Sequence, residues 1–147
     1  MKKRIISVVA LVLVVAMLSV VLVACAPKTV DDAKTKLAKK YDVIGGSQDI
    51  IVVGGLKGML TATNKENANI MVTAFYYEDA EKAKAAYSKI EADYESYKAD
   101  LKNKIKNEKD EEKKADLQAA LDASKIKQSG QWIAFGHKKA VGALFGL

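Results

Sequence analysis

Apolar and polar positions follow three different patterns along this chain. Residues 5–23 are apolar and carry no charge. Over residues 30–41 and 83–105, apolar side chains recur every three or four positions, the spacing of one face of a helix. Runs with strand composition occur at 50–53 with 56–63, at 69–77 and at 131–135. The pattern predicts a helix over 30–41, strands at these three runs, helical structure over 78–128 and a short helix over 137–145.

The segment 78–128 contains neither glycine nor proline. As one helix it would reach about 77 Å at 1.5 Å per residue, far beyond a domain of this size. Its apolar stripe stops at a charged run over 107–114 and resumes weakly beyond it. We favour a helical hairpin with its tip near 107–110 and a solvated charge run, with one long projecting helix as the alternative. The predicted core stripe is Ala83, Tyr87, Ile90, Tyr94, Tyr97, Leu101 and Ile105.

These elements predict the fold class. The expected order is α-β-β-α(α)-β-α, in which antiparallel strands pack against helices in an α+β domain. We expect a small antiparallel sheet of about three strands, with residues 69–77 at its centre and the helices packed mainly on one face. Residues 29–147 are predicted to form this single domain, and Thr29 is predicted to cap its first helix.

The N-terminal segment has the features of an export signal. Positive charge in residues 1–4 precedes the apolar run, and small residues flank Cys25, the only cysteine of the chain. The order Leu22-Val23-Ala24-Cys25 resembles the lipobox of bacterial prolipoprotein signals. This resemblance covers about the first 25 of 147 residues.

The resemblance implies a lipid anchor. In that family the cysteine thiol takes a diacylglyceryl group, the bond before it is cut, and the cysteine becomes the N-terminus, with its amino group acylated, for example by palmitate, in some bacteria. It would make residues 1–24 a cleaved signal peptide (cut between Ala24 and Cys25) and 25–28 a lipidated tether. Two or three acyl chains anchor stably, at about 0.8 kcal/mol per buried methylene. The alternative is an uncleaved transmembrane helix, since about 20 apolar residues span a bilayer. Both interpretations place the domain on the extracytoplasmic face of the cell membrane.

Charge and cysteine content exclude several classes of function. Removal of Lys2, Lys3 and Arg4 with the signal would lower the formal net charge from +6 to +3, and the rest of the chain contains no arginine. Arginine is the usual residue for bidentate contacts to phosphate and guanine, so nucleic acid is not expected as a partner. A single cysteine gives neither a disulfide framework nor a thiolate metal site.

Two motifs resemble ligand sites superficially. Gly54-Gly55-Leu56-Lys57-Gly58 lacks the spacing of a phosphate-binding loop and precedes a strand-like run, so we expect a bulge or tight bend. The aromatic residues could line a ligand groove, but helical spacing favours a place in the core, with hydroxyls reaching the surface. They are Tyr76, Tyr77, Tyr87, Tyr94, Tyr97 and Trp132.

His137, Lys138 and Lys139 form a candidate anion site at the start of the last predicted helix. Amides at a helix N-terminus bind anions readily, so anionic lipid or an envelope polymer is a conceivable partner. Solvated charge is the simpler alternative. His137 is the only histidine, which disfavours a metal site, and no serine lies in a recognisable nucleophile elbow.

These observations favour a non-enzymatic binding or adaptor module at the cell envelope. Its expected partners are membrane lipid, through acylated Cys25, and an envelope polymer, anionic lipid or protein. We expect no catalytic residue, no metal and no cofactor. The alternative is a small hydrolase that acts on envelope material. An enzyme should show convergent titratable groups with shifted pKa values, and a binding module an apolar groove or patch.

Overall fold

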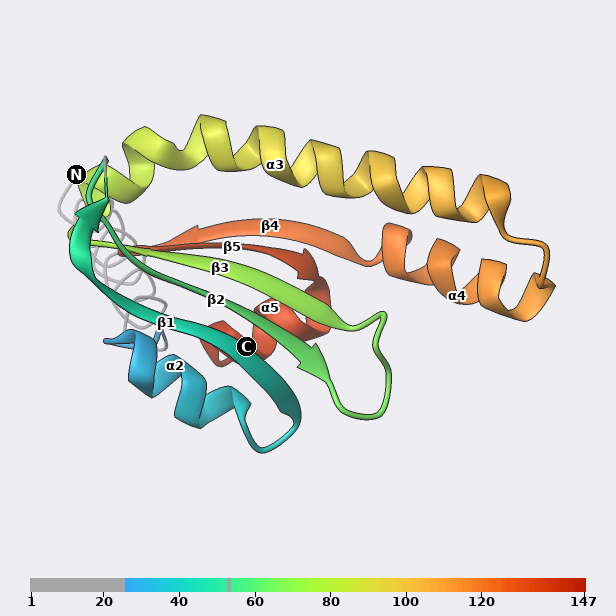
Figure 1. Cartoon of the computed structure of the whole chain (residues 1–147), viewed down its shortest axis with the longest axis horizontal. Coiled ribbons are helices and arrows are strands. Elements are labelled where there is room, and N and C mark those ends of the chain that lie inside the picture. The colour runs from blue at the N-terminus through green and yellow to red at the C-terminus, as the bar shows by residue number, and fades with distance from the viewer. Residues whose placement is uncertain (1–25, 53) are drawn as a thin grey trace, which may run out of the picture.

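The computed structural model of the chain describes residues 26–52 and 54–147, and the side chains of all of these except residues 48–52. Within these residues the chain forms four helices and five strands (Figure 1). In chain order they are α2 (Val30–Leu37), β1 (Tyr41–Val52), β2 (Leu56–Asn64), β3 (Met71–Tyr77), α3 (Ala80–Asn107), α4 (Glu111–Asp122), β4 (Ser124–Ser129), β5 (Trp132–His137) and α5 (Lys138–Phe145).

The five strands form one antiparallel sheet in the order β1-β2-β3-β5-β4. The chain is therefore α+β, and the central place predicted for residues 69–77 is confirmed. The predicted sheet of about three strands is wrong, and so is the order α-β-β-α(α)-β-α. The observed order is α-β-β-β-α-α-β-β-α, because the sequence pattern missed β1 as a separate strand and missed β4 altogether.

Alternate residues of the central strands point to opposite faces of the sheet and build two separate cores. Ala74 and Ala134 lie in the core that α2 and α5 complete. Their neighbours Phe75, Ile133 and Phe135 lie in the core that α3 completes. Helices therefore cover both faces (Figure 1), not mainly one face as the sequence predicted.

The first helix begins where predicted but ends early. The Thr29 hydroxyl accepts a hydrogen bond from the Asp32 amide at 3.1 Å, which caps α2. The helix stops at Leu37, and Tyr41 already belongs to β1 although its side chain is buried in the same core. The spacing over residues 30–41 thus indicated burial correctly, but the chain turns before Tyr41 instead of continuing as a helix.

The strand β1 runs through the glycine pair Gly45-Gly46. Gly45 has a φ of 105°, and a Cβ at this position would collide with the carbonyl oxygen of Met59 on β2. Glycine here permits a close approach of two strands. It is part of the strand pairing and not a strand end.

The edge strand β4 lies in the segment that the absence of glycine and proline predicts to be helical. Ile126 packs in the core beneath α3, whereas Lys125 and Lys127 line the side of the sheet that carries α5. Such alternation with a period of two is typical of a half-buried strand. Gly130, with a φ of 56°, makes the turn into β5.

The helical hairpin is confirmed, and one long helix is excluded. α3 ends at Asn107 and α4 begins at Glu111, capped by Asp110, whose carboxylate accepts the amides of Glu112 and Lys113. With 28 residues α3 is about 42 Å long, so its distal half extends beyond the sheet and runs beside α4 (Figure 1). Every member of the predicted stripe is buried or half-buried.

Candidate functional site

The predicted lipidation site Cys25 and the bond between Ala24 and Cys25 lie outside the described residues. The described chain begins with Ala26, the next residue. The geometry of the segment 26–28 is therefore the part of the structure that bears on the anchor.

The segment 26–28 lies against the folded domain. Trp132 donates a hydrogen bond from Nε1 to the Pro27 carbonyl at 2.7 Å, and the Tyr76 hydroxyl donates one to the Lys28 carbonyl at 2.7 Å. The two rings pack with centroids 4.8 Å apart, and Trp132 is 1% exposed. Ala26 packs against the same core. A lipid on Cys25 would therefore hold the domain close to the bilayer, with one residue between the acylated cysteine and the fastened Pro27.

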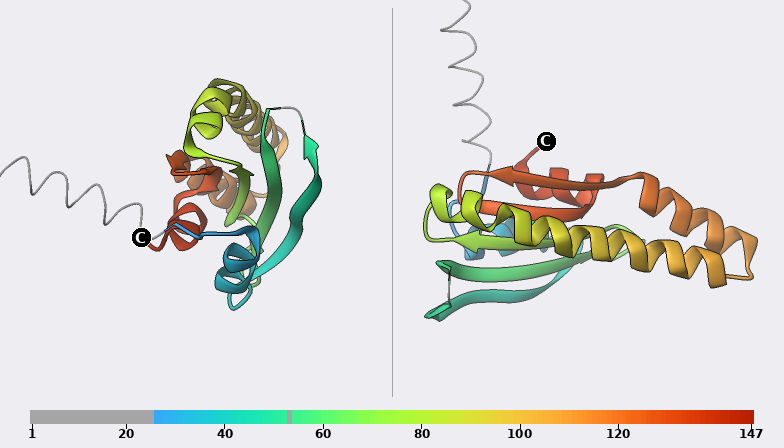
Figure 2. Two further views of the ribbon diagram at one scale, coloured as in Figure 1. Left: turned by 90° about the vertical axis from the view of Figure 1, so that its left-hand side faces the viewer. Right: turned by 90° about the horizontal axis from the view of Figure 1, so that it is seen from above.

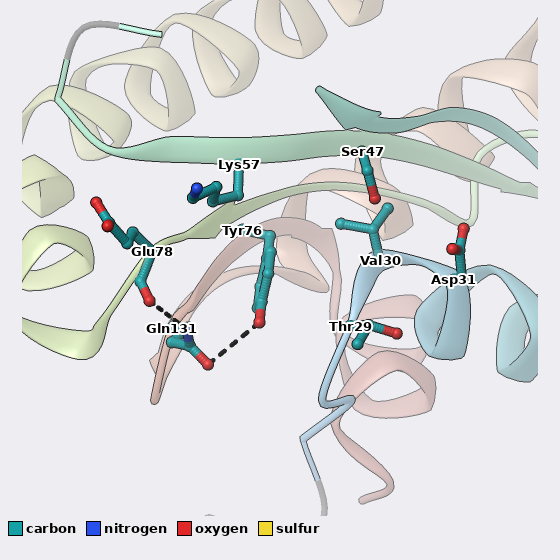
Figure 3. Close-up of a pocket in the computed structure, with 8 residues that line it drawn as sticks. All are labelled: Thr29, Val30, Asp31, Ser47, Lys57, Tyr76, Glu78 and Gln131. Atoms are coloured by element: carbon teal, nitrogen blue, oxygen red, sulfur yellow. Dashed lines mark hydrogen bonds between the residues drawn. The ribbon is translucent and has the colours of Figure 1, made fainter. Parts of the chain in front are cut away.

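A polar hollow of about 480 Å³ opens beside this segment (Figure 3). Figure 3 shows the amine of Lys57 directed toward Glu78 and away from Ser47. A serine nucleophile needs a base within hydrogen-bond reach, and no hydrogen bond joins Ser47 to any of the seven other lining residues drawn in Figure 3. The hollow is lined by Thr29, Val30, Asp31, Ser47, Lys57, Tyr76, Glu78 and Gln131.

One of the two carboxylates that line this hollow, that of Glu78, is ion-paired. Glu78 Oε2 lies 2.6 Å from Lys82 Nζ, and the hydrogen bond and charge of Lys82, followed by the charge of Lys57, lower the pKa of Glu78. Gln131 Nε2 donates to the backbone carbonyl of Glu78 at 2.6 Å. A general acid at neutral pH needs a raised pKa, so Glu78 is not prepared for that role.

The glycine-rich motif forms a turn and a strand. Gly54 and Gly55 have φ values of 92° and 77° in the turn between β1 and β2, and Leu56 opens β2. The pairing of β2 with β3 shifts register between Leu56 and Gly58, which is a bulge or similar irregularity. The motif does not open a helix, so it lacks the geometry of a phosphate-binding loop.

The predicted aromatic set is mostly core. Tyr77 and Tyr94 are buried, and the Tyr94 ring lies 5.9 Å from that of Phe135. The Tyr94 hydroxyl shares a hydrogen bond with the Ser124 hydroxyl at 3.1 Å. Tyr76 and Trp132 have a further role that the sequence did not indicate, because they fasten the segment 26–28.

His137 is a helix cap and is 8% exposed. Its Nδ1 accepts a hydrogen bond from the Lys139 amide at 3.1 Å, and the Lys138 amide donates to the Ala123 carbonyl at 2.7 Å. Burial, followed by the charges of Lys139 and Lys138, lowers the pKa of His137. The first two amides of α5 thus have partners within the chain, and the neutral imidazole is used as an acceptor. Any anion at this predicted site would depend on the lysine side chains.

Two further lysines join Lys138 and Lys139. Lys125 and Lys127 of β4 line the same hollow of about 270 Å³, beside Val141, Gly142 and Leu147 of the C-terminal segment. We call the set Lys125, Lys127, Lys138, Lys139 and Leu147 the lysine surface. The sequence prediction missed Lys125 and Lys127, since a helix over this segment would not have placed them beside α5; the alternation around Ile126 is the signal that could have found them.

A larger groove of about 840 Å³ lies between α3 and the strands β2 and β3. Its apolar residues include Leu56 and Phe75 from the sheet and Ile90 from α3. Lys82, Lys89, Glu78 and Asp93 contribute charges of both signs. The full lining is Gly54, Gly55, Leu56, Phe75, Tyr77, Glu78, Lys82, Ala85, Ala86, Lys89, Ile90 and Asp93.

The described part of the chain contains neither a metal-binding cluster nor a helix suited to span a membrane. Residues 26–52 and 54–147 hold no cluster of three or more histidine, cysteine, aspartate or glutamate side chains suited to a metal ion. Within the same ranges, no helix combines the length and apolar character that a bilayer span requires. Comparisons with protein-family models, with curated proteins and with solved structures gave no match.

Proposed function

We propose that this protein is a bacterial lipoprotein, anchored through acylated Cys25 to the extracytoplasmic face of the cell membrane, and that it acts there as a non-enzymatic binding module. The lipobox-like order Leu22-Val23-Ala24-Cys25 supports the anchor. The groove between α3 and the sheet carries the binding role, because it is the apolar recess that a binding module needs.

The groove has the chemistry of a site for an apolar or amphipathic ligand. Its volume of about 840 Å³ falls within the range of small-molecule sites. Its floor is apolar and stands on a strand pair and a long helix, which hold it in shape. The charged residues at its margin can orient the polar end of an amphipathic molecule. Burial, followed by the charge of Asp93, raises the pKa of Tyr77, so the phenol of this lining residue stays neutral.

The arrangement of the titratable groups favours binding over hydrolysis. The imidazole of His137 is buried and occupied as a cap. In the polar hollow, Glu78 is ion-paired with Lys82, and the Lys57 amine is directed away from Ser47 (Figure 3). Hydrolytic sites place a nucleophile, its base and an oxyanion donor within reach of one another.

Filling the groove tests the binding role. In a chain that begins at Ala26 and so keeps the contacts of Pro27 and Lys28, Ala85→Phe should reduce the fluorescence gained by the apolar probe N-phenylnaphthylamine. Ala99→Phe is the matched control, since Ala99 is exposed on the same helix outside the groove. Equal probe binding by both variants, with unchanged circular dichroism, would remove the groove as the ligand site.

A second experiment tests the anchor. Cys25→Ser should leave the full-length chain unlipidated, so that it accumulates either as the precursor or as released protein. The measurement is the mobility and membrane partitioning of both forms in cell fractions. Identical processing of the variant and the parent chain would contradict the lipoprotein assignment. Turnover of an envelope polymer that is abolished by His137→Ala would instead favour a hydrolase.

A further inference from the structure

We infer that the lysine surface is a second membrane contact, which docks the anchored domain on anionic lipid headgroups and fixes its orientation. This inference rests on the proposed lipid anchor at Cys25. It assigns a partner to Lys125, Lys127, Lys138 and Lys139: the phosphate-bearing headgroups of the membrane leaflet to which the anchor belongs.

The side chains that line the lysine surface carry positive charge. The hollow of the lysine surface is lined by four lysines and no acidic residue. The neighbouring hollow shares Lys139 and Leu147 with it and adds three lysines against a single acidic residue, Glu66; those three are Lys39, Lys40 and Lys65. A continuous surface of this sign attracts an anionic leaflet, at roughly 1 kcal/mol or a fivefold change in binding per lysine near the surface.

The anchored end of the chain lies on the same side of the domain as the lysine surface. Both views in Figure 2 show α5, β4 and the C-terminus on one side of the molecule and β1 on the opposite side. The described chain starts on the side of α5 and β4 as well (Figure 2). An anchor at residue 25 would therefore pull this side, and not the β1 edge, toward the bilayer.

The strand β5 sets the spacing between the two contacts. Trp132, which holds Pro27, opens this strand, and His137, which precedes Lys138, closes it. Five residue steps of an antiparallel strand span about 17 Å. The acyl anchor would hold one end of β5 and the lysine surface the other, so the domain would lie with β5 along the membrane plane. One anchor alone would leave the domain free to rotate.

An exposed apolar side chain lies among these lysines. Leu147 is 65% exposed, and its amide is tied to the Gly142 carbonyl at 2.9 Å. The Lys127 ammonium lies 5.2 Å from the centroid of the Phe145 ring, on the flank of α5. Cationic side chains around an exposed leucine suit the boundary between headgroups and acyl chains, where amphipathic surfaces bind.

Site-specific labelling tests the orientation in the full-length, membrane-extracted protein. Leu147→Cys is labelled with an environment-sensitive maleimide and added to vesicles of phosphatidylglycerol or of phosphatidylcholine. Ile44→Cys is the matched control, because Ile44 is also an exposed aliphatic residue (76%) but lies on the opposite edge strand. We expect a blue-shifted emission from residue 147 on phosphatidylglycerol only, and none from residue 44.

The parent chain separates failure of the anchor from failure of the docking. Its sole cysteine is Cys25, so an acylated parent takes no maleimide. A parent that is labelled overturns the anchor and the docking that rests on it. An unlabelled parent with equal emission from residues 44 and 147 on phosphatidylglycerol leaves the anchor standing and overturns the docking. A shift that is equally large on phosphatidylcholine also overturns it.

Charge variants test the lysines themselves. Changing Lys125, Lys127, Lys138 and Lys139 to Gln should abolish the shift at residue 147, and Lys138→Gln with Lys139→Gln alone should weaken docking roughly 25-fold. The control with the same charge change is Gln at Lys84, Lys102, Lys106 and Lys109, all exposed on α3 or just after it. A shift that persists without the four surface lysines would overturn the proposal. The proposal would also be overturned if a low concentration of soluble polyglycerol phosphate displaced the domain from the vesicles and abolished the emission shift, because an anionic polymer would then be the partner.

Discussion

The two faces of the sheet differ in how completely helices cover them. On the face of α2 and α5, Leu60, Trp132 and Phe145 are each at most 1% exposed. On the face of α3, the sheet extends beyond the area that the helix covers. Met59 pairs with Phe75 and Ile44 pairs with Thr61 on this face, and the side chains of Met59 and Ile44 are 41% and 76% exposed. The face that α2 and α5 cover therefore holds the most deeply buried side chains, whereas the face of α3 is covered only in part and contains the groove.

The largest loss of stability should come from a substitution on the face that α2 and α5 cover, which we call the closed face. Trp132→Ala should lower the free energy of unfolding by about 5 kcal/mol, the upper end for truncation of a buried aromatic residue. It also removes the hydrogen bond to the Pro27 carbonyl and so frees the segment 26–28. Urea unfolding measures the loss, and Trp132→Phe should recover most of the packing but not the hydrogen bond.

Tyr94 probes the partly covered face. Tyr94→Ala should cost about 3 kcal/mol, less than Trp132→Ala, because Tyr94 is 8% exposed and its face is more open. Tyr94→Phe should cost about 1 kcal/mol, since it loses the hydrogen bond with Ser124. A larger loss from Tyr94→Ala than from Trp132→Ala would reverse the comparison between the two faces.

His137, the cap of α5, adds a pH dependence to the stability of the domain. Burial holds the pKa of His137 in the folded protein below its ordinary value of 6.5. The unfolded chain therefore binds the proton more readily, so this contribution to stability is complete above pH 6.5 and is lost as the pH falls through the folded-state pKa. Protonation also removes the Nδ1 acceptor that caps α5, at a cost of about 1 kcal/mol.

The matched variant for this effect is His137→Asn, which keeps a capping acceptor but does not titrate. Urea unfolding at pH 7.5 and pH 5 should show a smaller loss for the asparagine variant than for the parent chain. An equal loss in both proteins would assign the acid sensitivity to other groups.

The smallest effect is expected at the tip of the helical hairpin, which lies beyond both cores. Asp110→Ala removes the cap of α4 and should cost about 1 kcal/mol or less. Lys109→Ala, next to it, should change stability very little because Lys109 is exposed and its neighbours supply the cap. Thermal unfolding measures both, and a loss above that of Tyr94→Ala would show that the tip supports the core.

Apolar periodicity predicted burial better than it predicted the elements. The stripe from Ala83 to Ile105 and the hairpin were correct, because a long helix repeats one signal many times. Tyr41 was correctly placed in the core but on the wrong element, since burial continues across the turn before it. Ile126 was assigned to a helix because one apolar residue in a six-residue strand cannot establish a period of two.

The candidate sites depend on contacts that join distant parts of the chain. Lys138 and Lys139 could be selected from the sequence, but Lys125 and Lys127 join them only through the pairing of β4 with β5. The groove joins Phe75 to Ile90 across the second core. Neither juxtaposition follows from local spacing, because each depends on which strands pair and which face a helix covers.

The mass of the intact protein extracted from membranes tests the proposed anchor most directly. We expect a chain that lacks residues 1–24 and carries a diacylglyceryl group on Cys25, with or without a further acyl group on its amine. Cys25→Ser should show neither the lipid mass nor cleavage by the lipoprotein pathway. A membrane-extracted protein that retains Met1, or that carries an unmodified Cys25, would contradict the account.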